Sequence, residues 1–435
     1  MARAGPEARN AMDTPVSLPR PAPARILAVG AWLKNAACRL DGTRVLMSPL
    51  HGDLDDPAAC AALEDSVQRL LALGPVDAVA HDLHPDFHST RLALALAQQL
   101  GVPAIGIQHH HAHIAVVQAE QGITGPLVGL ALDGVGLGTD DKPWGGELLL
   151  VHGAHWQRLG HLQPLALPGG DAAAREPWRL AAAVLHALGR GAEIPQRLGP
   201  AVGEGAAKLV ATMLVRGLNC PASTSAGRWF DAAAGLLGLS VRQVAEAEAA
   251  IALERLATHT VTALPTLIEA LAQEVQPPLA DANGTLALLP LLEHVAARGD
   301  AGRPGEAAAL FHVQLADALA GWAQRAARQY GSLQVALGGG CFFNRLLSAR
   351  LMDTLAALGL PTLRPQGVSP GDAGLALGQA WAAALQFAEQ RHPAAVPPEA
   401  AALAATAIAA ASSAAAATES ENPTRPVPAE TSPCA

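Results

Sequence analysis

The sequence predicts a two-lobed α/β protein on three observations. Apolar runs of strand length alternate with segments of helical spacing between residues 26 and 121, which is the pattern of an α/β sheet. A second pair of strand-like runs begins at Pro126, around a connection rich in Gly, Asp and Trp. Long segments of helical spacing follow it. The repeated start indicates two related lobes, the second with helical insertions.

The first lobe is expected at about residues 25–125. ILAVG at 26–30, a short polar turn and AACRL predict a strand pair, and the apolar spacing of residues 56–73 predicts a helix. The later elements are a strand VDAVAHD, a helix STRLALALAQQLG, a buried strand PAIGIQ and a helix HHHAHIAVVQAEQ. The last helix, GDAGLALGQAWAAALQFAEQ, is expected to join this lobe.

The second lobe is expected at about residues 126–370. PLVGLALDGVGLG and GGELLLVHG predict two strands. After them come two stretches of helical spacing, at residues 177–274 and 285–330. A strand at 333–339, a helix at 344–359 and the strand-like PTLRP at 361–365 follow. These elements complete the second lobe.

The two ends of the chain differ from the folded part, which we place at 25–388. Residues 1–24 and 389–435 are rich in Pro, Ala, Ser, Thr and Glu without periodicity. Such segments bury too little apolar surface to fold. Both ends are therefore expected to be disordered.

Composition argues against several classes of protein. Half of the 435 residues are apolar, yet no apolar run approaches the roughly 20 residues that cross a bilayer. The N-terminal segment has no apolar core of a secretory signal, so a cytoplasmic protein is expected. The five cysteines form no C-x-x-C pair, and the net charge is -9 with scattered Lys and Arg. These features argue against a zinc ribbon and against nucleic acid as a partner.

His109 and His113 stand four residues apart at the start of a predicted helix. This spacing places both imidazoles on one face, within reach of a single ion. Further ligands would be needed, and Asp133 and Asp372 are candidates because each sits in a Gly-rich turn beside an apolar run. The alternative is that four histidines in five residues only make a polar helix start. His110 and His111 would be supporting donors or surface groups.

Several Gly-rich turns could hold a nucleotide. Asp133-Gly-Val-Gly-Leu-Gly is followed by a strand, which excludes a dinucleotide fingerprint and favours a β-turn-β loop whose Gly134 and Gly136 admit phosphate. Gly338 and Gly339 close a strand before Asn344 opens a helix, an arrangement that suits adenine or an anion, although close packing explains it equally well.

Three further stretches admit two interpretations each. Asp231, on a predicted helix start near Gly227, could bind ribose hydroxyls, and a capping or salt-bridged Asp231 is equally allowed. Asp372 could be an ordinary N-cap of the last helix. Arg175 and Glu176 precede an apolar helix, where the Arg could grip a carbonyl or phosphate or merely be solvated.

Together these stretches resemble the hydrogenase-maturation carbamoyltransferase family HypF, in its C-terminal domain related to TsaD-type tRNA-modification proteins. The matching stretches are AVGAWLKN, HDLHPDF, QHHHAHIAVVQAE, LALDGVGLG with WGGE, LPGGDAAAREPWR, STSAGRWFDA, LGGGCFFN and SPGDAGLALGQAW. The resemblance implies the two-lobed fold shared by actin, sugar kinases and heat-shock chaperone ATPases (ASKHA), with a nucleotide in the cleft.

The resemblance also implies roles for single residues. His109, His113 and Asp372 would bind a divalent metal, iron or zinc, and Asp133 would lie close to the metal or phosphates. The ATP, AMP or carbamoyl-adenylate pocket would contain Asp133, Gly134, Gly136, Gly227, Asp231, Gly338, Gly339 and Asn344. Catalytic candidates from the remaining matched stretches are Lys34, Asn35, Arg175 and Glu176.

The chemistry implied by the resemblance is carbamoyl transfer. Carbamoyl phosphate and ATP become carbamoyl-adenylate, and this domain passes the carbamoyl group to the C-terminal cysteine thiol of the protein HypE, for the cyanide ligands of NiFe hydrogenase. Family members carry acylphosphatase, zinc-finger and YrdC-like modules ahead of this domain, and 24 residues have no room for them. We therefore expect either a shortened natural form or a partial protein that depends on another chain, a separate YrdC-like protein or a full-length HypF, to make carbamoyl-adenylate.

Two other functions remain as alternatives. A tRNA threonylcarbamoyl transferase is disfavoured by the acidic charge and by PGGDAAAREPWR, which resembles HypF alone. A non-catalytic module that binds nucleotide and HypE is disfavoured by the intact His109, His113 and Asp372. The family's Tyr-Glu stretch is Ala245-Glu246 here, a change that could loosen a pocket wall.

Overall fold

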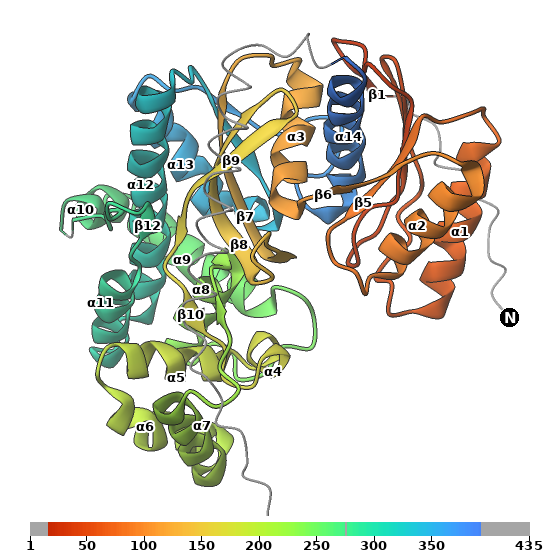
Figure 1. The fold of residues 1–435 in the computed structure, drawn as a ribbon. Helices are drawn as coiled ribbons and strands as arrows, with labels where there is room; N and C mark the ends of the chain where they lie inside the picture. The colour runs from red at the N-terminus through yellow and green to blue at the C-terminus, as the bar shows by residue number, and fades with distance from the viewer. Residues whose placement is uncertain (1–15, 275, 393–435) are drawn as a thin grey trace, which may run out of the picture.

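The computed structural model describes residues 16–274 and 276–392, which form two six-stranded sheets with helices around them (Figure 1). The first sheet has the order β1-β4-β3-β2-β5-β6. Its strands are β1 (Val16–Ser17), β2 (Ile26–Ala28), β3 (Cys38–Asp41), β4 (Arg44–Met47), β5 (Ala78–Asp82) and β6 (Ala104–Ile107). The first four strands in this order pair antiparallel, while β2, β5 and β6 run parallel.

The second sheet has the order β12-β9-β8-β7-β13-β14. Its strands are β7 (Leu127–Leu137), β8 (Pro143–His152), β9 (His155–Leu162), β12 (Thr285–Leu286), β13 (Val335–Gly338) and β14 (Thr362–Leu363). An antiparallel meander of β7, β8 and β9 is flanked by strands that run parallel to their neighbours. A small pair, β10 (Leu165–Ala166) and β11 (Ala222–Ser223), leads into the helical part.

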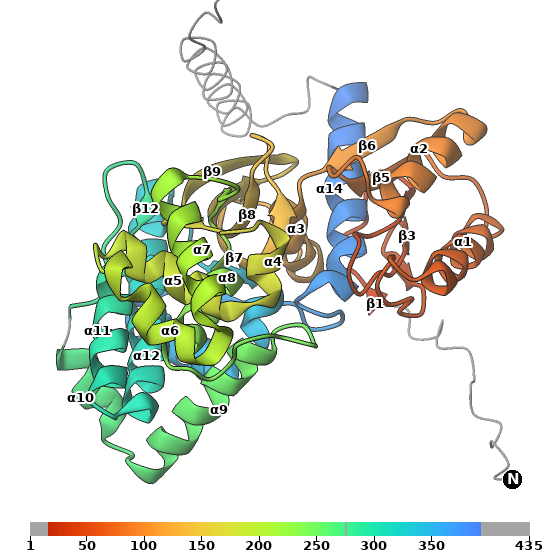
Figure 2. The same cartoon turned by 90° about the horizontal axis from the view of Figure 1, so that it is seen from below.

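Four helices cover the first sheet, and two of them join the lobes. Helices α1 (Pro57–Leu71) and α2 (His88–Leu100) cover one face. Helices α3 (His109–Gln121) and α14 (Leu375–Arg391) cover the other. In Figures 1 and 2, α3 and α14 lie between the two sheets. Because α3 also packs on β7, β8 and β13, one helix belongs to both cores.

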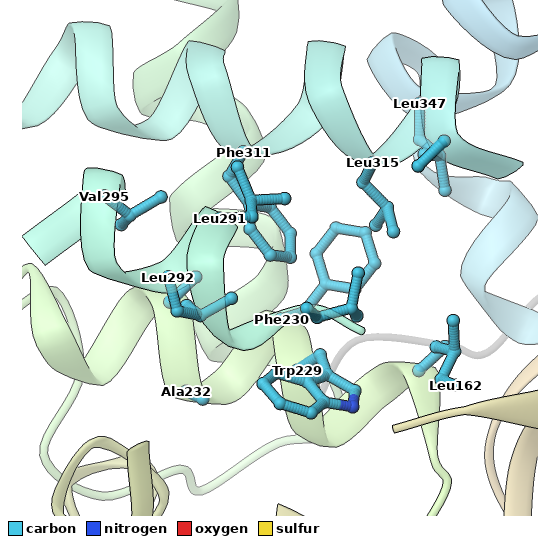
Figure 3. Close-up of a cluster of buried hydrophobic side chains, with 14 of the residues drawn as sticks. Leu162, Trp229, Phe230, Ala232, Leu291, Leu292, Val295, Phe311, Leu315 and Leu347 are labelled. Carbon is cyan, nitrogen blue, oxygen red and sulfur yellow. The ribbon is translucent and has the colours of Figure 1, made fainter. Parts of the chain in front are cut away.

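The remaining helices belong to the second lobe and form its largest core. They are α4 (Asp171–Arg175), α5 (Pro177–Ala187), α6 (Ile194–Val202), α7 (Glu204–Arg216), α8 (Ala226–Leu236), α9 (Glu248–Ala263), α10 (Leu267–Glu274), α11 (Leu289–Asp300), α12 (Pro304–Tyr330) and α13 (Arg345–Ala357). Figure 3 shows Phe230 of α8 beside Phe311 of α12, with Trp229 next to them. The two Phe rings pack edge to face at 5.0 Å. Fully buried aromatic rings of this kind fix the insertion to the sheet.

Most predicted elements occur where the sequence places them, although no strand was predicted at β4, β10, β11 or β12. The expected disorder of residues 1–24 is wrong for 16–24, because β1 pairs with β4 and Leu18 is buried. Strand β9 was not predicted, since HWQRLGHL lacks a continuous apolar face. The last helix ends at Arg391, and the predicted tail beyond 392 lies outside the described residues. Within the described part, no helix has both the length and the apolar character to span a bilayer.

The contact between α3 and α14 depends on Gly378. A Cβ atom added there would collide with the backbone carbonyl of Ala112 on α3. We expect Gly378→Ala to lower the free energy of unfolding by about 3 kcal/mol through overpacking. Gly321→Ala in α12 is the matched control, because its added Cβ meets only the Arg325 side chain at 3.8 Å. This change should leave stability unchanged or raise it by about 1 kcal/mol. Urea denaturation measures both, and equal effects would contradict the close crossing.

Candidate metal and nucleotide site

Four potential metal ligands meet where α3 approaches the second sheet. His109 and His113 project from the first turns of α3, Asp133 comes from β7, and Asp372 comes from the 3-10 turn η3 (Asp372–Gly374) before α14. One ligand atom of each lies within 4.8 Å of all the others. The structure thus brings together residues from distant parts of the chain. The farthest apart, His109 and Asp372, are separated by 263 positions in the sequence.

Both imidazoles direct Nε2 at the same carboxylate oxygens. Nε2 of His109 lies 3.1 Å from Oδ2 of Asp133 and 3.5 Å from Oδ1 of Asp372. Nε2 of His113 lies 3.3 and 3.5 Å from the same two atoms. The four atoms therefore surround one point, as the ligands of a single ion do.

Asp82 supports this arrangement from behind. Its Oδ2 lies 2.8 Å from Nδ1 of His109, and its side chain is fully buried at the end of β5. A carboxylate on the far nitrogen fixes the tautomer and leaves Nε2 free to bind a metal. Histidine ligands in metal sites commonly have such a partner.

The charges of the site fit a cation. Burial disfavours the charged form of His109, but Asp372, Asp133 and Asp82 outweigh it and raise its pKa well above the ordinary value. Burial likewise opposes ionisation of Asp133, yet hydrogen bonds from both histidines lower the pKa of that carboxyl.

The structure decides between the open interpretations of these residues. All four histidines of residues 109–113 are buried, so they do not form a polar helix start. His110 and His111 are buried against Trp144 and Trp156, not on the surface. Asp372 is not the N-cap of α14, because that position is Gly374 and no side chain caps the helix.

Two glycines allow the backbone to approach the histidines closely. A Cβ on Gly136 would lie 2.7 Å from Cγ of His109, and one on Gly338 would lie 2.9 Å from the His113 carbonyl oxygen. Gly339 has a φ of 107°, which a side chain would strain. Gly338 and Gly339 therefore shape the wall of the site next to Gly340, which lines both cavities beside Asp133, and their contact with a nucleotide stays a prediction.

Two adjoining cavities of about 390 and 310 Å³ open beside Asp133. Both are lined by the side chain or backbone of Lys34, Asp133, Gly134, Arg228, Glu246, Ala247, Gly340 and Phe343. The backbone N–H of Gly340 donates to Asp133 Oδ1 at 3.1 Å, and the Ser225 hydroxyl donates to the Asp133 carbonyl at 3.1 Å. The Asp133 turn is thus fixed at the floor of the cleft.

The predicted nucleotide residues divide into two groups. Those that line the larger cavity are Asp133, Gly134, Gly227, Asp231 and Asn344, and those that do not are Gly136, Gly338 and Gly339. Asp231 lies inside α8, not at its start, and forms a 2.8 Å ion pair with Arg228. Burial raises the pKa of Asp231 and Arg228 opposes the rise.

Asn344 is the N-cap of α13 and has little freedom to turn. Its Oδ1 accepts from the Leu347 N–H at 2.9 Å, and its Nδ2 lies 2.9 Å from Nε2 of His312. His312 bonds the Ala308 carbonyl through Nδ1, which leaves Nε2 as an acceptor. A buried chain of hydrogen bonds thus holds this wall of the cavity.

The four catalytic candidates have different surroundings. Lys34 has a positive φ of 44° and reaches across the cleft to Glu246 at 2.7 Å. Arg175 lines the smaller cavity.

Asn35 and Glu176 line none of the cavities described around the site, and in this they differ from the expectation. The amide of Asn35 is buried and donates to the carbonyls of Val29 and Ala31, so it braces the loop before Lys34. Glu176 binds Arg179 and Arg242.

Sequence reasoning missed Asp82, Arg228 and Glu246. Asp82 ends a predicted strand, so its place at the carboxyl edge of the sheet was the available signal. Arg228 stands three residues before Asp231 in the helix that begins at Ala226, which places both on one face. Glu246 lies in an irregular segment, and nothing local connects it with Lys34.

Comparison with known proteins identifies the family. A profile described as "HypF Kae1-like domain" matches residues 21–120, and one described as "Carbamoyltransferase, Kae1-like Domain, second subdomain" matches residues 129–379. The chain is 61% identical over 368 residues to a carbamoyltransferase HypF homolog of Cupriavidus necator, covering 83% of this chain and 92% of that protein. It is 47% identical over 397 residues to carbamoyltransferase HypF2 of the same organism, covering 86% of this chain and 48% of the relative.

Solved structures agree with this assignment. A crystal structure of full-length HypF in the phosphate- and nucleotide-bound form matches with a TM-score of 0.76 and 29% identity, covering 86% of this chain and 57% of that one. HypF of T. kodakarensis matches with a TM-score of 0.77 and 28% identity, covering 87% and 49%. The chain thus spans about half the length of these longer relatives, and the expected two-lobed fold class is confirmed. By sequence and by fold, this chain belongs to the HypF family of carbamoyltransferases.

Proposed function

We propose that this chain transfers a carbamoyl group from carbamoyl-adenylate to the C-terminal cysteine thiol of a HypE protein, toward the cyanide ligands of NiFe hydrogenase. One observation carries the proposal: the four ligand groups, three of them buried, meet beside a cleft of nucleotide size that Asp133 and Asp372 line. The nucleotide bound to a related HypF supports a nucleotide in this cleft.

The residues of the cleft suit a leaving AMP. Gly134 presents bare backbone to the larger cavity, so a phosphate can approach the chain closely. Lys34 of the first lobe and Arg228 of the second lobe both line this cavity and provide positive charge. When bound at His109, His113, Asp133 and Asp372, iron or zinc would supply further positive charge for the phosphate and the carbamoyl oxygen.

The transfer requires no nucleophile from this chain. The acceptor thiolate attacks the carbamoyl carbon, a C–S bond forms, and the C–O bond to the phosphate breaks with its electron pair leaving on AMP. The thiol proton passes to solvent. A separate YrdC-like chain or a full-length HypF would supply carbamoyl-adenylate, since that is made by another module in this family.

The central test supplies carbamoyl-adenylate, metal and HypE, and detects the carbamoylated cysteine by mass spectrometry. We expect transfer by the wild-type chain and a loss of at least about a hundredfold in His113→Ala, the scale on which removing a group that stabilises transition-state charge acts. Absence of transfer with metal present overturns the proposal. Transfer that His113→Ala leaves unchanged would show that this cluster is not the reacting site.

Metal binding has its own test at Asp82. We expect Asp82→Asn to weaken zinc or iron affinity by about 10- to 100-fold, because His109 loses the carboxylate that orients it. Competition with a chelator measures the affinity. Asp65→Asn, the same change at an exposed position of α1 away from the site, should leave it unchanged. Equal affinities for wild type and Asp82→Asn would contradict a supporting role for Asp82.

Nucleotide binding is tested at the ion pair between Lys34 and Glu246. Both side chains are about half exposed, 45% and 54%, so the pair itself is weak and a phosphate can replace Glu246. We expect Lys34→Met to weaken AMP binding about tenfold, as the loss of one charge-assisted hydrogen bond does. Glu246→Gln should leave AMP binding unchanged or strengthen it. Calorimetry measures both, and weaker binding in Glu246→Gln would contradict this exchange of partners.

A further inference from the structure

Glu147 of β8 is fully buried, and it lines none of the cavities described around the site. Its Oε1 accepts hydrogen bonds from the N–H groups of Gly145 and Gly146 at 3.0 and 3.2 Å, and from the Thr224 hydroxyl at 2.5 Å. Its Oε2 accepts from Nε of Arg158 on β9 at 2.6 Å. Burying a carboxylate is costly, and these four donors compensate this one.

Arg158 fixes this carboxylate within the second sheet. It lies opposite Leu149 of β8, two positions from Glu147, so both charged side chains project from the same face. The guanidinium carbon of Arg158 also lies 3.6 Å from the centre of the Trp144 ring, which is buried. Glu147 therefore has little freedom to turn away from Thr224.

Thr224 connects Glu147 with the wall of the nucleotide cleft. The next residue, Ser225, is the N-cap of α8, and its hydroxyl accepts the Arg228 N–H at 3.2 Å. The same hydroxyl lies 3.1 Å from the Asp133 carbonyl oxygen. Asp133 and Arg228 both line the larger cavity. A chain of hydrogen bonds thus runs from the buried carboxylate to two residues of the cleft.

The two glycines that donate to this carboxylate also contact the wall of the cleft. A Cβ atom on Gly145 would lie 2.7 Å from the Asp133 carbonyl oxygen and 3.0 Å from Cα of Ser225. One on Gly146 would lie 2.5 Å from the Thr224 carbonyl oxygen. Strand β8, the Asp133 turn and the segment before α8 are therefore in close backbone contact, and the carboxylate joins them at one point.

We propose that Glu147 is a positioning residue for the nucleotide, which acts through Thr224 and Ser225 and touches no substrate itself. This inference rests on the proposed function and adds a residue that keeps the cleft in its binding shape. Because Glu147 holds Thr224, Ser225 keeps the Asp133 turn and the first turn of α8 at a fixed spacing. The nucleotide then meets a wall that is already ordered, which lowers the entropic cost of binding.

The test compares AMP binding in variants at Glu147 and Thr224, measured by calorimetry. We expect Glu147→Gln to raise the Kd of AMP about fivefold, the scale on which a residue outside a site acts through a network of contacts. Thr224→Val removes only the hydroxyl and should raise the Kd by a similar factor, whereas Thr224→Ser keeps the hydroxyl and should bind AMP as the wild type does. The double variant of Glu147→Gln and Thr224→Val should bind no more weakly than Glu147→Gln alone, because both changes break the same chain.

Asp317→Asn is the matched control for a general loss of stability. Asp317 of α12 also pairs with an arginine and a threonine, Arg350 at 2.8 Å and Thr354 at 3.0 Å. None of these three residues lines a cavity described around the site. We expect Asp317→Asn to lower the free energy of unfolding and to leave the Kd of AMP unchanged.

The inference is overturned if either Glu147→Gln or Thr224→Val binds AMP as tightly as the wild type, or if their effects add in the double variant. It is overturned as well if Asp317→Asn weakens AMP binding as much as they do. Should Glu147→Gln fail to fold, the difference between Thr224→Val and Thr224→Ser decides. If the wild-type chain itself binds no AMP, the nucleotide part of the proposed function fails and the inference fails with it.

Discussion

The close crossing of α3 and α14 is the contact on which the site depends. Gly378 of α14 lies against the Ala112 carbonyl of α3, one residue before His113. The turn that leads into α14 carries Asp372. The distance between the imidazoles and this carboxylate is therefore set by a backbone contact between two helices, which neither helix can relax alone. A second contact, that of α3 with β7 in the second sheet, places Asp133 beside the same imidazoles.

The site holds more negative charge in the protein interior than is usual for a stable core. Asp133 and Asp372 lie beside both imidazoles and Asp82 lies beside that of His109, so three carboxylates face two histidines. Buried carboxylates are costly unless positive charge compensates them. A divalent ion bound here would compensate this charge and would stabilise the folded protein. The cluster is thus easier to explain as a binding site than as a structural network.

The sequence predicts the local part of this site and not the distant part. The spacing of His109 and His113 on a helix is a local property, and so are the Gly-rich turns. That Asp133 and Asp372 share one point with them depends on the pairing of β7 with β13 and on the crossing of α3 with α14. No local pattern encodes these contacts, so the family resemblance was needed. Strand β9 was not predicted for a similar reason. Its composition is polar, and the pairing with β8 that compensates for this is not a local feature of the sequence.

The ion pair of Lys34 and Glu246 shows how the lobes meet over the cleft. Lys34 belongs to a loop of the first lobe that Asn35 braces from inside, with its amide on the carbonyls of Val29 and Ala31. Glu246 belongs to an irregular segment of the second lobe. The ammonium group of Lys34 is thus carried by a loop that hydrogen bonds hold in place, and its partner Glu246 is carried by a less regular segment. A ligand phosphate would compete with Glu246 for Lys34. Because the backbone of Lys34 is already in place, binding would cost little further conformational entropy.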